Sequence, residues 1–585
     1  MTNWLRISLA AAFLLLACAD SGYQQTPAVQ KSTGMVVTAN PLATKAGADI
    51  LRAGGSAVDA AIAIESVLSL VEPQSSGLAG GGFMIHFDNN KKTLRVYNGR
   101  ETAPASATAD MFLDENGKEP GFLTSKHSGV ATGVPGAVAM LKLAHVDYGK
   151  LPWGVHFNEA LRLSREGFAI SPRLHGFIKF YQRVVPVAAE EGLLDTINYL
   201  FDDQGQPLPV GHLLKNPDYA ETLTAVAEDP RNFYVGKIAT DMVDRVQMAP
   251  RAGGLTEQDF ADYEAKRHDA LCIAYRDNTL CGPPPPSSWV AVGMVSGLLE
   301  RGPAFSEGGA QDVVNWALFG EAQRLAYADR DKFVADDTFV SVPIAGMLSD
   351  SYLDERAQLI SSKQAIEHIT AGDPWKHQGV SKMSPGEDNT LDVAGTTHFI
   401  VVDGEGNVVS MTATVESVFG SARMSGGMFL NNQLTDFSRT PTDADGNQLV
   451  NAAEPGKRPR SSMSPTIVLD KDGEFLMATG SPGGNSIIAY TAKTLVAVLD
   501  WGLSAQEAID LPNLVARGDL IRIEGERSED SLEAALRSFG YQLEAGRGEN
   551  SGLSTVVKRA NGVLEGGVDP RREGVIEVVT IETPN

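Results

Sequence analysis

One junction in the sequence places a threonine where it could become a nucleophile. Residues 373–395 are polar and lack periodicity, so they read as an exposed loop, and they lead directly into a β-rich run that begins Thr396-Thr397-His398. Cleavage of the Gly395–Thr396 bond would give Thr396 a free α-amine beside its hydroxyl. An α-amine has a pKa of about 8 and can act as the base that activates the hydroxyl. Because Thr-Thr-His also suits an ordinary strand, the assignment depends on the other motifs of the chain.

Further motifs rich in glycine, proline, hydroxyl and charged residues accompany this junction. After Thr396 the chain contains Asn431-Asn432-Gln433, Asp436-Phe437-Ser438, residues 457–465 (KRPRSSMSP) and residues 479–484 (TGSPGG). Before Thr396 the chain contains residues 100–104 (RETAP), 133–136 (GVPG) and 284–288 (PPPSS), and near its end it contains residues 569–571 (DPR).

Taken in this order, the motifs closely resemble those of the gamma-glutamyltransferase family, from about residue 35 to the end of the chain. The resemblance implies an α/β protein with layered α+β architecture, the αββα sandwich of N-terminal-nucleophile hydrolases. It implies one precursor that cuts itself into a large chain, residues 35–395, and a small catalytic chain, residues 396–585, intertwined as a heterodimer. It implies no cofactor, γ-glutamyl compounds such as glutathione as substrates, and water, amino acids or peptides as acyl acceptors.

The family's functional residues transfer to this sequence by motif. Thr396 matches the nucleophile, Thr414 a threonine that hydrogen-bonds it, and Gly483-Gly484 the glycines that donate N–H groups to the oxyanion. Arg100 matches the ligand of the substrate α-carboxylate, for which a guanidinium offers planar bidentate recognition. The remaining substrate-binding positions are Ser461 and Ser462 for the carboxylate, and Gln433 and Asp436 for the α-ammonium.

Glu416 departs from the commoner pattern, because many members have Asn there, and a carboxylate near an ammonium group is electrostatically sensible. Two other functions remain open. A glutaryl or cephalosporin-type acylase of the same fold would have no use for Asp436, since its substrates lack the α-ammonium. A non-catalytic surface lipoprotein would not require the complete set of nucleophile, Thr414, glycine pair and Arg100.

Hydrophobic periodicity predicts the elements that hold these motifs. Residues 41–71 read as two helices broken at Gly54-Gly55, followed by a strand at 83–87. Thr396–Val402 and Val408–Thr414 read as a hairpin around Asp403–Asn407, and a second hairpin joins 466–469 to 475–478. Helices are predicted near 485–500, 504–511 and 529–539, and strands near 554–558 and 575–581. Hairpins flanked by helices indicate stacked sheets covered by helices.

The N-terminus reads as an export signal. Arg6 precedes an apolar run at 7–17 that is too short to span a bilayer, and Leu15-Leu16-Ala17-Cys18 resembles a bacterial lipobox. We therefore expect a lipoprotein signal peptide at 1–17, lipidation at Cys18, a flexible tether at 18–34 and a periplasmic or cell-envelope location. An ordinary secretory peptide with an incidental cysteine is the alternative.

Composition limits the remaining function classes. A formal net charge of −24 argues against a nucleic-acid partner, because a phosphate backbone would repel the protein. The chain has three cysteines, of which Cys272 and Cys281 flank a predicted turn at Arg276-Asp277. These two could form a cross-strand disulfide or remain buried thiols. No Cys or His cluster has the sequence spacing of metal ligands, so no metal site is expected.

Overall fold

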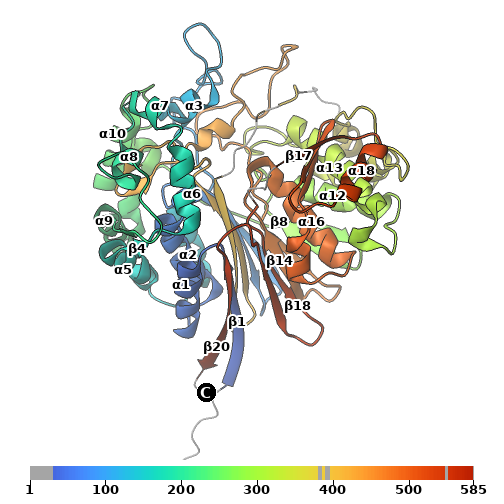
Figure 1. The fold of residues 1–585 in the computed structure, drawn as a ribbon, viewed down its shortest axis with the longest axis horizontal. Helices are drawn as coiled ribbons and strands as arrows, with labels where there is room; N and C mark the ends of the chain where they lie inside the picture. The colour runs from blue at the N-terminus through green and yellow to red at the C-terminus, as the bar shows by residue number, and fades with distance from the viewer. Residues whose placement is uncertain are drawn as a thin grey trace, which may run out of the picture.

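Two β-sheets stacked face to face form the centre of the structure, and helices cover both outer faces (Figure 1). The computed structural model describes residues 30–190, 192–379, 385–388, 390, 395–546 and 551–583. The layers follow the order helix, sheet, sheet, helix, so the predicted αββα sandwich is confirmed.

The first sheet has seven antiparallel strands in the order β20-β1-β9-β10-β2-β3-β6 among the described residues. Its strands are β20 (Val575–Thr583), β1 (Gln30–Thr38), β9 (Thr396–Val402), β10 (Val408–Thr414), β2 (Gly81–Asp88), β3 (Thr93–Asn98) and β6 (Lys266–His268). β1 lies between β20 and β9, which both follow residue 395 in the chain. The segments before and after Gly395–Thr396 are therefore interleaved within one sheet.

The second sheet has six antiparallel strands in the order β19-β18-β14-β13-β8-β7 in the described part of the chain. These are β19 (Leu564–Val568), β18 (Ser554–Lys558), β14 (Phe475–Gly480), β13 (Thr466–Leu469), β8 (Asn278–Gly282) and β7 (Leu271–Tyr275). Apolar side chains from the two sheets meet between them, among them Val37, Ile85, Ile400, Ile467 and Val556. This dry layer fixes the sheets face to face.

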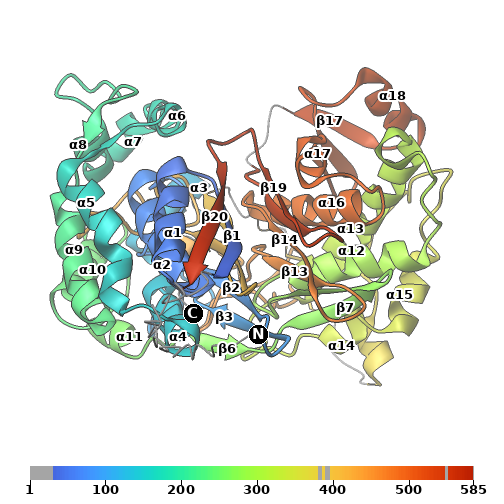
Figure 2. The ribbon, with the colours of Figure 1, turned by 90° about the horizontal axis from the view of Figure 1, so that it is seen from below.

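Helices pack on the two outer faces, as Figures 1 and 2 show. On the first sheet lie α1 (Pro41–Arg52), α2 (Ala57–Val71), α4 (Ala137–Tyr148), α5 (Asn158–Glu166), α9 (Pro217–Glu228) and α10 (Lys237–Gln247). On the second lie α12 (Trp289–Arg301), α13 (Val313–Phe333), α15 (Asp350–Ala357), α16 (Ile487–Leu499), α17 (Ala505–Asp510) and α18 (Asp530–Ser538). A three-stranded sheet of β15 (Leu514–Arg517), β16 (Leu520–Glu524) and β17 (Gln542–Gly546) extends this side.

The β9–β10 hairpin fixes the position of the predicted nucleophile. Its register pairs Thr396 directly with Thr414, at the end of the strands opposite the turn. Gly395 packs closely beneath the following loop, where an added Cβ would lie 2.2 Å from the Glu416 carbonyl oxygen. Only glycine fits this approach, so the residue before Thr396 is determined by packing as well as by chemistry.

Two predictions about the ends of segments are wrong. The tether predicted at 18–34 stops earlier, because β1 already begins at Gln30 and pairs with β20 along its whole length. The loop at 373–395 was expected to be exposed, yet Asp388, Thr390 and Gly395 are buried. Asp388 forms a buried ion pair with Arg460, 2.9 Å apart, which holds the segment inside the protein.

The cysteine alternatives are resolved in favour of a disulfide. Cys272 on β7 and Cys281 on β8 are directly opposite each other and are bonded. Cys18 and the predicted signal peptide lie outside the described residues. Among the residues that the structure covers, no helix is both long enough and apolar enough to cross a membrane.

A buried carboxyl group in α2 gives a testable pH effect. Glu65 is fully buried, and burial raises its pKa to about 8 from the ordinary 4.5, with the charge of Glu72 adding to the effect. The folded protein therefore holds this proton over a range in which the unfolded chain releases it, and folding stability falls as pH rises from about 4.5 to 8. Glu65→Gln, which imitates the neutral acid, should melt like wild type at pH 5 and several degrees higher at pH 8. Equal melting temperatures at both pH values would contradict an uncharged Glu65.

Candidate active site

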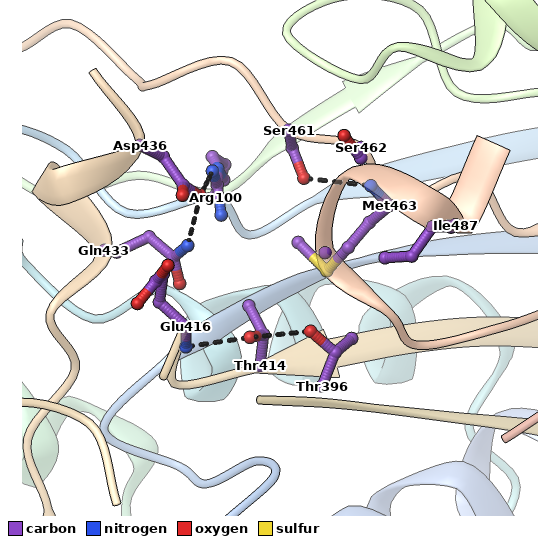
Figure 3. A pocket seen from close by; sticks show the side chains of 11 residues that line it. Arg100, Thr396, Thr414, Glu416, Gln433, Asp436, Ser461, Ser462, Met463 and Ile487 are labelled. Carbon is purple, nitrogen blue, oxygen red and sulfur yellow. Dashed lines mark hydrogen bonds and ion pairs between the residues drawn. The ribbon is translucent and has the colours of Figure 1, made fainter. Parts of the chain in front are cut away.

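A small polar pocket at the edge of the first sheet brings together almost all of the predicted site residues (Figure 3). Its lining comes from both sides of the Gly395–Thr396 bond. The lining residues are Arg100, Thr396, Thr414, Glu416, Gln433, Asp436, Ser461, Ser462, Met463, Gly484 and Ile487. Of the predicted catalytic and substrate-binding residues, only Gly483 is not in the lining, and it directly precedes Gly484.

Thr396 and Thr414 form a hydrogen-bonded chain that ends on the carbonyl of the Gly395–Thr396 bond. The Thr396 hydroxyl donates to Thr414 Oγ1 at 3.1 Å, and the Thr414 hydroxyl donates to the Gly395 carbonyl oxygen at 2.8 Å. The Glu416 backbone N–H donates to Thr414 Oγ1 at 2.8 Å and helps to fix that hydroxyl. The arrangement fixes the Thr396 hydroxyl beside Thr414 and places a hydrogen-bond donor on the carbonyl immediately before Thr396.

The Gly483-Gly484 pair lies at the start of α16. Gly483 has φ 135° and Gly484 has φ 56°, and a Cβ on Gly483 would lie 2.6 Å from the Tyr490 ring. Residues 484–486 form a 3₁₀ turn that continues into the helix. Backbone N–H groups at such a position have no partner within the helix and are suited to an oxyanion.

Arg100 and Asp436 lie side by side in the pocket wall, although 335 residues separate them in the chain. Arg100 Nη2 donates to Asp436 Oδ2 at 2.5 Å, and Gln433 Nε2 donates to the same oxygen at 2.7 Å. Arg100 is further held by the carbonyl oxygens of Pro459 and Arg460. All three side chains are buried, so each charge has been removed from water and placed beside the other.

Glu101 does not compete with Asp436 for the guanidinium. Glu101 Oε2 lies 3.7 Å from Arg100 Nη1, but burial raises the pKa of Glu101 to about 8 despite the nearby positive charge. Glu101 is therefore mostly neutral at pH 7, and the charge of Arg100 remains directed towards Asp436 and the pocket.

Ser461 and Ser462 are held in place by residues that precede Thr396. The Ser461 backbone N–H donates to the Pro286 carbonyl, and the Ser288 N–H donates to the Ser461 carbonyl. Arg330 from α13 donates from Nη2 to Ser462 Oγ at 2.8 Å and from Nε to Ser288 Oγ at 2.9 Å. Because Ser462 Oγ accepts a hydrogen bond from Arg330, the proton of the Ser462 hydroxyl points away from Arg330.

Glu416 lines the pocket in a conformation that few residues adopt. Its φ is 80°, and its carboxylate accepts hydrogen bonds from the Ser417 hydroxyl and the Asn432 side chain. Lys126 is buried nearby, donates to the Val418 carbonyl at 2.9 Å and exerts its charge on Glu416. Burial lowers the pKa of Lys126 to about 8.

Sequence reasoning missed several residues of the site. Met463 and Ile487 supply its apolar wall. Arg330 lies in a helical region without a recognisable motif, so no sequence signal indicated it. Arg572 donates from Nη1 to the Thr396 carbonyl at 2.9 Å, and its place directly after Asp569-Pro570-Arg571 was the signal that could have found it.

Comparisons with known proteins agree with this geometry. The family model for gamma-glutamyltranspeptidase matches residues 43–579. Glutathione hydrolase proenzyme of Bacillus subtilis strain 168 is 35% identical over 92% of this chain and 90% of its own length. Acylase ACY 1 proenzyme of Pseudomonas sp. strain V22 is 34% identical over 95% of both chains. The crystal structure of cephalosporin acylase from Bacillus halodurans superposes with a TM-score of 0.81 at 26% identity, covering 96% of this chain and 99% of that one.

Proposed function

This chain belongs to the gamma-glutamyltranspeptidase family, and from that premise we propose that it cuts itself before Thr396 and then cleaves γ-glutamyl amides through a Thr396 ester. The acyl group passes to water or to the amine of an amino acid or peptide. Glutathione is the expected substrate, as the names of related enzymes suggest.

Self-cleavage follows from the contacts around Gly395. The Thr396 oxygen attacks the Gly395 carbonyl carbon, the C–N bond breaks, and the peptide becomes an ester with a free α-amine on Thr396. Water then hydrolyses the ester and leaves a large chain that ends at Gly395. The Thr414 hydroxyl, 2.8 Å from the Gly395 carbonyl oxygen, stabilises negative charge on that oxygen during attack.

The same groups serve the second reaction. The α-amine freed by cleavage takes the hydroxyl proton as Thr396 attacks the γ-amide carbonyl, and the leaving amine receives a proton. N–H groups at Gly483-Gly484 receive the oxyanion. Water or an acceptor amine then attacks the ester and regenerates Thr396.

One observation carries the substrate assignment: Arg100 and Asp436 are paired in the pocket that contains Thr396. A γ-glutamyl group ends in an α-carboxylate and an α-ammonium, which are the charges complementary to this pair. Binding replaces the Arg100–Asp436 pair with two ion pairs, one between Arg100 and the α-carboxylate and one between Asp436 and the α-ammonium. Gln433 and Glu416 assist in binding the ammonium, and Ser461 and Ser462 assist in binding the carboxylate. No net charge is left unpaired.

An acylase that removes glutaryl groups is the second candidate, favoured by the superposition on cephalosporin acylase. A glutaryl group has a carboxylate for Arg100 but no ammonium. Its binding would take the guanidinium and leave Asp436 buried without that partner, which is costly. The pair therefore favours the γ-glutamyl substrate.

The deciding experiment compares release of an aniline chromophore from its γ-glutamyl amide and its glutaryl amide, each with and without glycylglycine. We expect strong preference for the γ-glutamyl compound, and stimulation by glycylglycine would reveal acyl transfer. Preference for the glutaryl compound would identify an acylase, and no release from either by fully cut protein would support a non-catalytic lipoprotein.

Arg330 should act on the substrate through Ser462. In Arg330→Met, Ser462 Oγ loses a charged donor, and we expect the KM for the γ-glutamyl anilide to rise about tenfold with a smaller change in kcat. Arg330→Lys should restore part of the loss. The anilide of 4-aminobutyrate lacks the α-carboxylate, so its kcat/KM should not change in Arg330→Met. An equal loss on both substrates would indicate a general structural role instead.

For location, we infer export and lipid attachment at Cys18, supported by the sequence at 15–18. Cys18→Ser should abolish incorporation of labelled fatty acid and release the protein from the membrane fraction. Unchanged membrane association in that variant would exclude this anchor.

A further inference from the structure

Three side chains remote from the Thr396 pocket converge on one point at the start of α2. Asp59 lies in the first turn of α2, His145 in the last turn of α4, and His156 in the 3₁₀ turn Trp153–Phe157. Each offers one ligand atom, and these atoms all lie within 4.8 Å of one another. Asp59 and His156 are fully buried, and His145 is 13% exposed. None of them lines the pocket described above.

The two carboxylate oxygens of Asp59 have different roles. Oδ2 accepts three backbone N–H groups, from Ser56, Lys150 and Leu151, at 2.8–3.1 Å. Within the described part of the chain Oδ1 accepts no hydrogen bond, and it lies 2.9 Å from His156 Nε2 and 3.7 Å from His145 Nε2. The hydrogen bonds to Oδ2 hold the carboxylate in place, so Oδ1 stays directed at the two imidazoles.

The contact between Asp59 Oδ1 and His156 Nε2 is short but is not an aligned hydrogen bond, since neither atom has a hydrogen-bond partner among the described residues. His156 Nδ1 lies 2.7 Å from the Trp153 carbonyl and must donate to it, because a carbonyl only accepts. In the neutral ring, Nε2 therefore carries a lone pair beside a carboxylate oxygen. Two buried acceptors at this distance need a cation between them.

A metal ion satisfies this arrangement. Ligand atoms about 2.0–2.2 Å from one ion lie roughly 3 Å from each other and point at the ion rather than at each other. A histidine ligand whose second ring nitrogen donates to a backbone carbonyl is the usual support for such a site, as His156 shows. His145 Nε2 lies 2.9 Å from the Leu151 carbonyl, whose oxygen offers a fourth ligand atom.

We propose that Asp59, His145 and His156 form a binding site for a divalent transition-metal ion of the zinc class. Two imidazoles and one carboxylate are a donor set that Zn²⁺ accepts. On binding, His145 gives up the Nε2 proton that it shares with Leu151 and takes a proton from solvent at Nδ1, so the ring stays neutral and all three side chains supply lone pairs. The ion would join α2, α4 and the 150–157 segment, and so stabilise the large chain without entering catalysis. Sequence spacing could not indicate this site, because its ligands come from three separate elements.

The test uses tag-free full-length protein, treated with EDTA, desalted and titrated with Zn²⁺ in a calorimeter, with Co²⁺ absorption as an independent readout. We expect one ion per chain and a melting temperature that rises by a few degrees with excess Zn²⁺. His156→Leu, which suits the apolar neighbours Trp153 and Phe157, should bind no ion and show no thermal shift. His145→Gln provides a second variant if the first folds poorly.

The matched control is His377→Gln. His377 lies 3.3 Å from Glu355 in a histidine–carboxylate pair elsewhere, and this variant should bind one ion like wild type. Release of the aniline by His156→Leu would confirm an intact fold. Absence of one-to-one binding in wild type would overturn the proposal and indicate an imidazolium–carboxylate pair instead. Unchanged binding in both His156→Leu and His145→Gln would also overturn the proposal.

Discussion

Thr396→Ala is expected to purify as a single uncut chain with amidase activity reduced by at least about 1,000-fold. The variant lacks the oxygen that attacks the Gly395 carbonyl, so no α-amine is released, and it also lacks the nucleophile for the substrate. Wild-type protein should separate into two chains, the smaller with the N-terminal sequence Thr-Thr-His-Phe-Ile. Denaturing electrophoresis with N-terminal sequencing measures processing, and aniline release measures activity.

Two neighbouring variants make this result specific. Thr396→Ser keeps a hydroxyl and should process and turn over, at a reduced rate. Thr397→Ala removes a buried hydroxyl that has no hydrogen-bond partner among the described residues and that belongs to the opposite face of β9, so processing should remain normal. Normal processing of Thr396→Ala, or an uncut wild-type chain after long incubation, would remove Thr396 from the mechanism.

The elements around Thr396 were predictable because their signals are local. Two runs rich in β-forming residues and the Asp403–Asn407 turn between them defined the β9–β10 hairpin, with bounds that the structure reproduces. Neighbouring residues also indicated the helix break at Gly54-Gly55 and the possible pairing of Cys272 with Cys281 across a turn. By contrast, β19 and the three-stranded sheet β15–β17 were missed, since short strands with charged residues lack a clear period.

Tertiary contacts account for the other errors. Residues 30–34 have a tether-like composition, but β20 provides a partner strand for them from the far end of the chain. Residues 385–390 are polar, yet Arg460 and Ser438 give Asp388 the partners that a buried carboxylate needs. In both segments the stabilising partner is distant in sequence, so local composition was misleading.

Contacts between site residues were also beyond what the sequence could predict. Motif resemblance identified Arg100 and Asp436 separately, as ligands of opposite substrate charges. It gave no indication that the two side chains form an ion pair with each other, or that Arg330 donates a hydrogen bond to Ser462. The pairing matters because it keeps both buried charges compensated until a zwitterionic group of the right shape replaces it.

Asp436→Asn therefore tests substrate recognition directly. The amide has the shape of the carboxylate but no charge for the α-ammonium, so kcat/KM for the γ-glutamyl anilide should fall about 100-fold. The glutaryl anilide has no ammonium to lose, and Arg100 is freed from its partner in this variant. The kcat/KM for the glutaryl anilide should stay constant or rise, so the ratio of the two kcat/KM values shifts towards the glutaryl compound.

Processing provides the internal control for Asp436→Asn. The hydrogen bonds that join Thr396, Thr414 and Gly395 are separate from those that Asp436 accepts from Arg100 and Gln433. The variant should therefore still yield two chains at the normal rate. Arg100→Met should instead weaken both substrates, because both carry the carboxylate that the guanidinium binds. Equal losses on both substrates in Asp436→Asn would mean that Asp436 merely holds Arg100 in place. The α-ammonium would then need another ligand, for which the candidate is Glu416, the other carboxylate that lines the pocket.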